Sequence, residues 1–93
     1  MGLKVTVKFF AYLRDIFRGR KEQIELPSGS SVGDLLNLLC DSQARREQIF
    51  DCHELRPQMM VLKNGNHIQH FRGLDTILED EDTIVLIPPV GGG

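Results

Sequence analysis

Hydrophobic and polar residues alternate over the first part of the chain. From Leu3 to Phe9 every second residue is apolar, and lysine or threonine lies between them. Because successive side chains of a strand point to opposite faces, this pattern predicts a strand with one buried face. The alternation stops at Phe9-Phe10-Ala11-Tyr12, and a second short strand is predicted to end at Ile24-Glu25-Leu26. We expect the two strands to form a hairpin with an irregular connection from Leu13 to Glu22.

A helical pattern follows Pro27-Ser28-Gly29. Apolar side chains recur at i, i+3, i+4 and i+7 and therefore share one face of a helix: Val32, Leu35, Leu36 and Leu39. Ser30 or Ser31 can cap the start of this helix, and Asp34 lies in its first turn, where the helix dipole favours negative charge. We expect the helix to cover one face of the sheet. Cys40 continues the apolar face, which predicts a core residue rather than a redox centre.

The second half of the chain predicts a short helix and three strands. Polar residues dominate from Gln43 to Glu54, where the short helix is expected. Met59–Leu62 predicts a strand, and Asn64-Gly65 predicts a hairpin turn because both central positions of a type I′ turn need positive φ. A fourth, short strand is expected at His67–Gln69. The last strand is predicted from Thr83 to Ile87.

The order of these elements predicts an α+β fold of the β-grasp type. In this mixed sheet one main helix packs on one face, and the first and last strands lie parallel at the centre. Residues 1–87 would form the domain and residues 88–93 a flexible tail. The run Ile84–Ile87 is apolar at every position, and Phe10 breaks the polar register of the first strand. Either the loop Phe71–Leu78 covers these extra apolar side chains, or they form an open docking surface beside the tail.

The tail itself reads Pro88-Pro89-Val90-Gly91-Gly92-Gly93. The two prolines fix φ and donate no hydrogen bond, so they stop the strand and direct the tail away from the body. Glycine has no Cβ, so the end of the chain can enter a channel too narrow for side chains, and its carboxylate is unhindered. Six residues reach roughly 20 Å, far enough to enter a partner's active site.

Composition limits the function classes. The chain has 93 residues, which predicts one domain, and a net charge of −2 gives no electrostatic reason to expect binding to nucleic acid or to an anionic membrane. Cys40 and Cys52 form no CxxC pair, and neither a leader nor a membrane-spanning segment is apparent. We therefore expect a cytoplasmic, reduced, soluble protein.

The remaining candidate residues do not predict a catalytic or metal-binding site. His67 and His70 are three positions apart in a predicted strand or turn, where they tend to face opposite sides, and Cys52-His53 lies elsewhere, so no metal site is expected. No arrangement resembles a self-contained active site. Four basic residues of the first connection are interpreted as solvated turn residues, with contact to an acidic partner as the alternative: Arg14, Arg18, Arg20 and Lys21.

Five short motifs of the chain are characteristic: Phe9-Phe10-Ala11-Tyr12-Leu13-Arg14, Leu62-Lys63-Asn64-Gly65, Leu74-Asp75-Thr76, Asp80-Glu81-Asp82-Thr83 and Pro88-Pro89-Val90-Gly91-Gly92-Gly93. Together they resemble the ubiquitin-like sulfur-carrier family. The branch most like this chain is the small subunit of molybdopterin synthase, and the thiamine-pathway sulfur carrier is more distant. Two departures occur: Glu81 stands where the family commonly has glycine, and three terminal glycines replace the usual two.

The resemblance implies a defined chemistry at Gly93. An E1-like activating enzyme would use ATP to adenylate its carboxylate, and a sulfur donor would then convert it to a thiocarboxylate. The chain itself would bind no cofactor. An acceptor enzyme, such as the large subunit of molybdopterin synthase, would receive the sulfur. The residues implied to contact these partners are Pro88, Pro89, Val90, Gly91, Gly92 and Phe10.

Three alternatives stay open at the sequence level. The sulfur could serve cysteine or thiamine synthesis, for which the chemistry of this chain would be the same. The chain could be a protein modifier that joins Gly93 to lysines through isopeptide bonds. It could also be a plain binding module with an inert tail.

Overall fold

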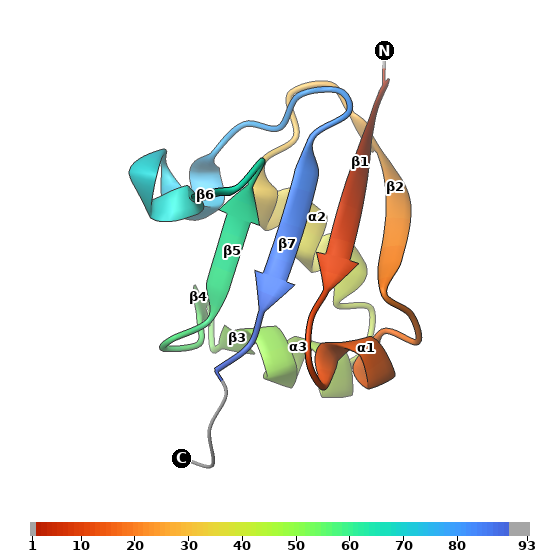
Figure 1. Cartoon of the computed structure of the whole chain (residues 1–93). Helices are drawn as coiled ribbons and strands as arrows, with labels where there is room; N and C mark the ends of the chain where they lie inside the picture. The colour runs from red at the N-terminus through yellow and green to blue at the C-terminus, as the bar shows by residue number, and fades with distance from the viewer. Residues whose placement is uncertain (1, 90–93) are drawn as a thin grey trace.

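A five-stranded mixed sheet with helices on one face forms the body of the protein (Figure 1). The computed structural model describes residues 2–89. The strand order in this sheet is β2-β1-β7-β5-β6. The elements are β1 (Gly2–Phe9), α1 (Leu13–Ile16), β2 (Lys21–Pro27), α2 (Val32–Leu39), α3 (Gln43–Ile49), β3 (Phe50–Asp51), β4 (Glu54–Leu55), β5 (Met60–Lys63), β6 (Asn66–His67), the 3-10 helices η1 (Ile68–His70) and η2 (Gly73–Asp75), and β7 (Thr83–Ile87).

The first and last strands lie side by side at the centre of the sheet. β1 and β7 are parallel, with Val7 opposite Ile84 and Phe9 opposite Leu86, and these side chains are buried on the helix-covered face. β2 and β5 flank this central pair in antiparallel orientation. The predicted β-grasp fold is confirmed.

The predicted hairpin between β1 and β2 is confirmed, but its connection is more ordered than the sequence indicated. It contains the four-residue helix α1, which begins at Leu13. Leu13 is fully buried, and the Phe17 ring stacks on Phe9 with 4.6 Å between ring centroids. So short a helix is unstable alone and shows no periodic pattern, so tertiary packing forms it.

Helix α2 covers the sheet as predicted. Ser31 is its N-cap: the Ser31 hydroxyl accepts a hydrogen bond from the Asp34 N–H, and the Asp34 carboxylate accepts one from the Ser31 N–H. This capping box satisfies two backbone donors at the start of the helix. The four predicted apolar residues are buried in the core: Val32, Leu35, Leu36 and Leu39.

The segment after α2 differs in part from its prediction. The short helix is confirmed as α3, but it ends at Ile49, and the chain then forms the small hairpin β3–β4, which was not predicted. Asn64 and Gly65 have φ values of 50° and 89°, as a type I′ turn requires. The strand expected at His67–Gln69 is wrong beyond His67, because η1 begins at Ile68 and buries that side chain in the core.

The loop Phe71–Leu78 packs beside the start of α2 and not over the outer face of the sheet. Ile77 forms an isolated bridge with Ser31, and the Val32 N–H donates to the Thr76 carbonyl. Leu78 is buried in the core on the helix side. The alternative in which this loop covers the extra apolar residues of the last strand is therefore wrong.

The acidic turn before β7, which we define as Glu79 to Asp82, contains a strained residue. Glu81 has a φ of 68°, and its N–H donates to the Lys4 carbonyl at 2.7 Å. A residue with a Cβ pays about 1 kcal/mol or more in this left-handed conformation. The glycine that is common at this position in the resembling family would adopt it without that cost.

Replacing Glu81 by glycine is therefore expected to stabilise the protein. We expect Glu81→Gly to raise the free energy of unfolding by about 0.5 kcal/mol, because the relieved strain exceeds the entropy that glycine adds to the unfolded chain. Urea denaturation measures the change. Glu81→Ala is the matched control, since it removes the charge and keeps the Cβ. Equal stabilisation by both variants would assign the effect to charge repulsion in the turn.

Candidate functional site

The chain leaves the body from the centre of the sheet. β7 lies between β1 and β5 and ends at Ile87, Pro88 is buried, and Pro89 is half-buried. The exit lies at the end of the molecule that also carries α1 and α3 (Figure 1). The predictions for Val90, Gly91, Gly92 and Gly93 concern residues outside the described part of the chain.

Apolar side chains gather on the open face of the sheet beside this exit. Val85 lies opposite Leu62, and Ile87 lies opposite Met60. These positions alternate with the buried ones, so they point away from α2. Phe10 follows β1 directly, and its N–H donates to the Leu86 carbonyl at 3.1 Å. We call these five residues the apolar face: Phe10, Met60, Leu62, Val85 and Ile87.

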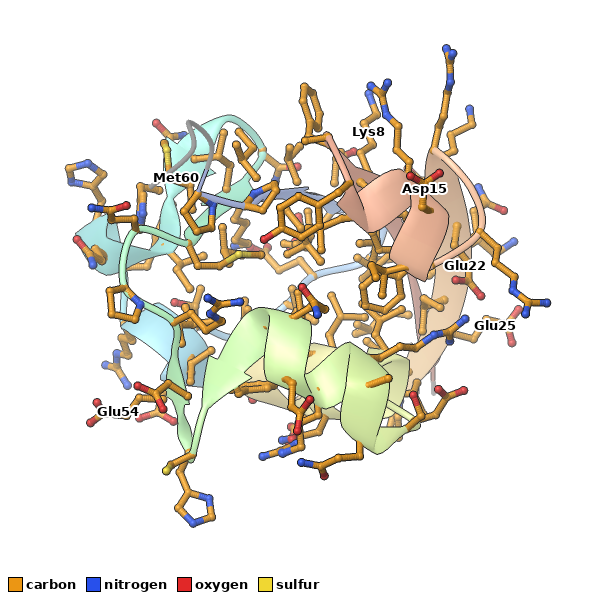
Figure 2. All side chains as sticks on the ribbon, turned by 90° about the horizontal axis from the view of Figure 1, so that it is seen from below. Lys8, Asp15, Glu22, Glu25, Glu54 and Met60 are labelled. Atoms are coloured by element: carbon orange, nitrogen blue, oxygen red, sulfur yellow. The ribbon has the colours of Figure 1, made fainter. Side chains whose placement is uncertain are left out.

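The two ends of the apolar face are the most exposed. Met60 is 42% exposed and Phe10 is 41% exposed. Figure 2 shows Met60 and Lys8 projecting on the side of the sheet opposite α3. Lys8 lies opposite Val85, so a lysine borders the apolar residues directly. The arrangement is an apolar contact surface that surrounds the departing chain and has a charged margin.

Arg14 fixes the geometry of Phe10. The Arg14 Nε–H donates to the Phe9 carbonyl at 3.1 Å, and the guanidinium carbon lies 5.6 Å from the centre of the Phe10 ring. The intervening Ala11 has a φ of 53°, which turns the chain sharply after β1. The sequence pointed to Phe10 as a contact residue, and the structure places it beside the end of β7 through its backbone bond to Leu86.

The sequence pointed to Val85 and Ile87 through the apolar run of the last strand, but it did not identify Met60 and Leu62 as members of the apolar face. Met60 and Leu62 were assigned to a strand, but only the register of β5 against β7 brings them next to Val85 and Ile87. The available signal was the uninterrupted apolar run of the last strand. In a strand with one exposed face, apolar and polar residues alternate. The uninterrupted run therefore indicated an apolar outer face, but it did not reveal which residues of neighbouring strands complete that face.

Lys63 is buried on the opposite face and is engaged in a structural network. Its Nζ lies 3.3 Å from Glu79 Oε1 and 3.6 Å from Asp82 Oδ2. Asp82 Oδ1 accepts a hydrogen bond from Asn64 Nδ2, which ties the acidic turn to the β5–β6 turn. This lysine is therefore occupied in holding β7 to its neighbours.

The structure places the two cysteines in different environments. Cys40 is buried at the end of α2, as predicted, and burial raises the pKa of its thiol from 9.0 to about 11. The positive charge of Arg46 opposes this shift only in part. Cys52 is exposed at the β3–β4 turn with a φ of 59°. Both thiols are free.

Alkylation should distinguish the two thiols. Iodoacetamide at about pH 8 is expected to modify Cys52 and to spare Cys40 in the folded protein, because only about one Cys40 thiol in a thousand is then ionised and it is buried. Intact mass should show a single adduct, and a second should appear only in urea. Two adducts formed at equal rates on the native protein would contradict the described core.

The other sequence candidates do not form a site in the structure. His67 Nδ1 accepts a hydrogen bond from the Gln69 N–H, and His70 lies exposed at the end of η1. Residues 2–89 contain no cluster of three or more His, Cys, Asp or Glu side chains suited to holding a metal ion. Within the same part of the chain, no helix has both the length and the apolar character needed to cross a bilayer.

Comparison with known proteins gives consistent results. Residues 7–93 match the sequence model of the ThiS family. Small archaeal modifier protein 3 of Haloferax volcanii is 29% identical over 92 residues, which cover 98% of this chain and 100% of that protein. The molybdopterin synthase sulfur carrier subunit of Mycobacterium tuberculosis is 33% identical over 92 residues, which cover 98% of this chain and 99% of that protein.

A solved structure is similar over the whole chain. The solution structure of small archaeal modifier protein 1 from Methanosarcina acetivorans has a TM-score of 0.83 and 34% sequence identity. The match covers 100% of this chain and 99% of that one. The resemblance inferred from the short motifs is thereby confirmed for sequence and fold.

Proposed function

The chain belongs to the ThiS family of ubiquitin-like sulfur carriers, and from this premise we propose that its tail carries sulfur as a thiocarboxylate on Gly93. A carboxylate is a poor acyl donor because its leaving group would be oxide. In an activating enzyme, a carboxylate oxygen attacks the α-phosphorus of ATP, pyrophosphate leaves, and the oxygen becomes the bridge of an acyl-adenylate. A sulfur nucleophile then attacks the carbonyl carbon, the bond to AMP breaks, and AMP leaves.

The observation that supports this proposal most directly is the exit geometry. β7 delivers the chain from the centre of a rigid sheet, and Pro88 is buried in the body. The tail would therefore start from a fixed point, which lowers the entropy lost when it enters a partner. The apolar face around the exit supplies a surface on which the partner can rest. The partner would provide the ATP site and the acid-base groups.

We place the chain in molybdopterin synthesis as the small subunit of the synthase. The 33% identity with the Mycobacterium tuberculosis sulfur carrier subunit, over nearly the full length of both proteins, supports this assignment. Activated sulfur would pass from Gly93 to a pterin precursor held by the large subunit. Carriers for cysteine or thiamine synthesis would use the same tail chemistry with another acceptor.

A second candidate function is protein modification. The relatives from Haloferax volcanii and Methanosarcina acetivorans are named as small archaeal modifier proteins, which favours a test for isopeptide bonds. The activated intermediate is common to both functions. A lysine amine would attack the acyl group in place of sulfur.

The deciding experiment is intact-mass analysis of the protein after incubation with an E1-like activating enzyme, ATP and sulfide. A gain of about 16 Da on the C-terminal fragment, one sulfur for one oxygen, is the expected result. Omitting ATP is the control. Two results together would contradict sulfur transfer: no activating enzyme of the source organism produces the gain, and glycine remnants are found on lysines of other proteins. The function would then be protein modification.

Transfer to the acceptor separates the pathways. The thiocarboxylate form is mixed with the molybdopterin synthase large subunit and its pterin precursor. The measurement is the decrease of about 16 Da in the mass of the carrier when its sulfur is transferred. A carrier for another pathway would keep its sulfur in this mixture.

A further inference from the structure

Charge is unevenly distributed along the sheet axis. The segment from Lys8 to Glu22 contains five basic and two acidic residues, a net charge of +3, whereas the whole chain has −2. Four consecutive acidic residues, Glu79 to Asp82, lie at the other end of β1, where the Lys4 N–H donates to Asp80. Lys8, the nearest member of the basic group on β1, lies four residues from Lys4 and therefore about 13 Å from it along the strand.

We call the basic group the basic corner. Its five side chains are all exposed: Lys8, Arg14, Arg18, Arg20 and Lys21. They belong to the end of β1, the connection that holds α1, and the start of β2, which lie at the end of the molecule where β7 leads out (Figure 1). The ion pairs found within residues 2–89 involve Arg45 and Lys63 and none of these five. Their positive charge is therefore not neutralised by close carboxylates in the described part of the protein.

Arg14 is the fixed member of this group. One of its nitrogens, Nε, is bound to the Phe9 carbonyl, and the guanidinium lies over the Phe10 ring. The Gly19 N–H donates to the Arg14 carbonyl, so the backbone is held as well. The terminal nitrogens make no hydrogen bond within residues 2–89. A guanidinium held in this way loses little entropy when it binds a carboxylate through two hydrogen bonds.

We infer that the basic corner binds an acidic rim on the protein that receives the tail. This inference rests on the proposed function only in requiring that the tail enters a partner. The corner adjoins the apolar face, because Phe10 belongs to that face and packs under Arg14. The partner surface should therefore combine an apolar patch with carboxylates beside the mouth of its channel.

The charge asymmetry also orients the encounter. A partner with a negative rim attracts the corner and repels the acidic turn, so the carrier approaches with its tail first. Charges of this kind act mainly on the association rate and are screened by salt. Nucleic acid is the competing occupant of a basic patch, and the net charge of −2 opposes it.

The first experiment measures association with the activating enzyme that produces the mass gain. The variant Arg18→Gln/Arg20→Gln, which leaves Arg14 in place, and the variant Arg14→Gln are compared with Arg72→Gln, an exposed arginine of the opposite end. Stopped-flow association rates are expected to fall about tenfold for the corner variants at low salt and to stay unchanged for Arg72→Gln. Circular dichroism checks that each variant folds.

Two further readouts keep the two proposals distinguishable. At saturating enzyme the corner variants should still gain the sulfur, because the reacting group is untouched. Arg14→Lys should restore the association rate, since it keeps the charge, but its complex should dissociate faster, because it loses the planar fork. Association rates equal to wild type in both corner variants would overturn the inference and leave the sulfur chemistry intact.

A second experiment needs no enzyme. Amide NMR shifts are recorded on the full chain with an acetylated hexaglutamate peptide, and separately with a single-stranded DNA hexamer. Hexaglutamate should shift amides in residues 8–21 and spare those in residues 79–82, and added salt should abolish the effect. Shifts spread over the whole surface, or a stronger effect of the DNA at the corner, would overturn the inference.

Discussion

Adding one leucine after Gly93 is expected to abolish sulfur loading. The added residue moves the reactive carboxylate onto a carbon that bears a bulky side chain, and a channel shaped for bare backbone excludes it. We expect the rate of the 16 Da gain to fall by more than about a hundredfold, as found when reacting groups are displaced by an ångström or more. Timed intact-mass measurements give the rate.

The matched control adds a residue at the other end of the chain. A leucine inserted before Gly2 changes mass and composition equally, and Gly2 begins β1 at the end of the sheet away from the tail exit (Figure 1). This variant should load at the wild-type rate. Normal loading of the C-terminally extended protein would contradict the proposed role of Gly93.

The second large effect is expected on the apolar face. Met60→Asp places a charge among side chains that a partner must cover, opposite Ile87 on the neighbouring strand. We expect the dissociation constant of the complex with the activating enzyme to rise by about 10 to 100-fold, which corresponds to about 1.4 to 2.8 kcal/mol. Calorimetric titration measures the change.

Ile77→Asp is the control for this substitution. Ile77 is 51% exposed, similar to Met60, but it bridges to Ser31 near the start of α2, away from the tail exit. Its replacement should leave the dissociation constant unchanged while altering net charge equally. An equal weakening by both variants would show that overall charge, not the apolar face, controls binding.

Where the chain carries a strong local pattern, the fold could be predicted from sequence. The alternation from Leu3 to Phe9, the apolar stripe of α2 and the turn at Asn64-Gly65 each depend on neighbours within a few residues. These patterns, together with the order of the elements, were sufficient to predict parallel pairing of β1 and β7.

The parts that were missed depend on contacts between distant residues. Helix α1 exists because Leu13 and Phe17 are buried, and Phe17 stacks on Phe9. η1 replaces the expected strand because Ile68 turns into the core. The apolar face depends on the register between β5 and β7, and the sequence indicated its existence through Ile84–Ile87 but not its members on β5.

The parallel central pair has a consequence for synthesis of the protein. Val7 meets Ile84 across 77 positions of sequence, so the middle of the sheet stays open on the ribosome until the last strand has been made. A nascent chain without β7 has no finished core and no tail. Truncation before β7 therefore leaves the central strand β1 without its parallel partner.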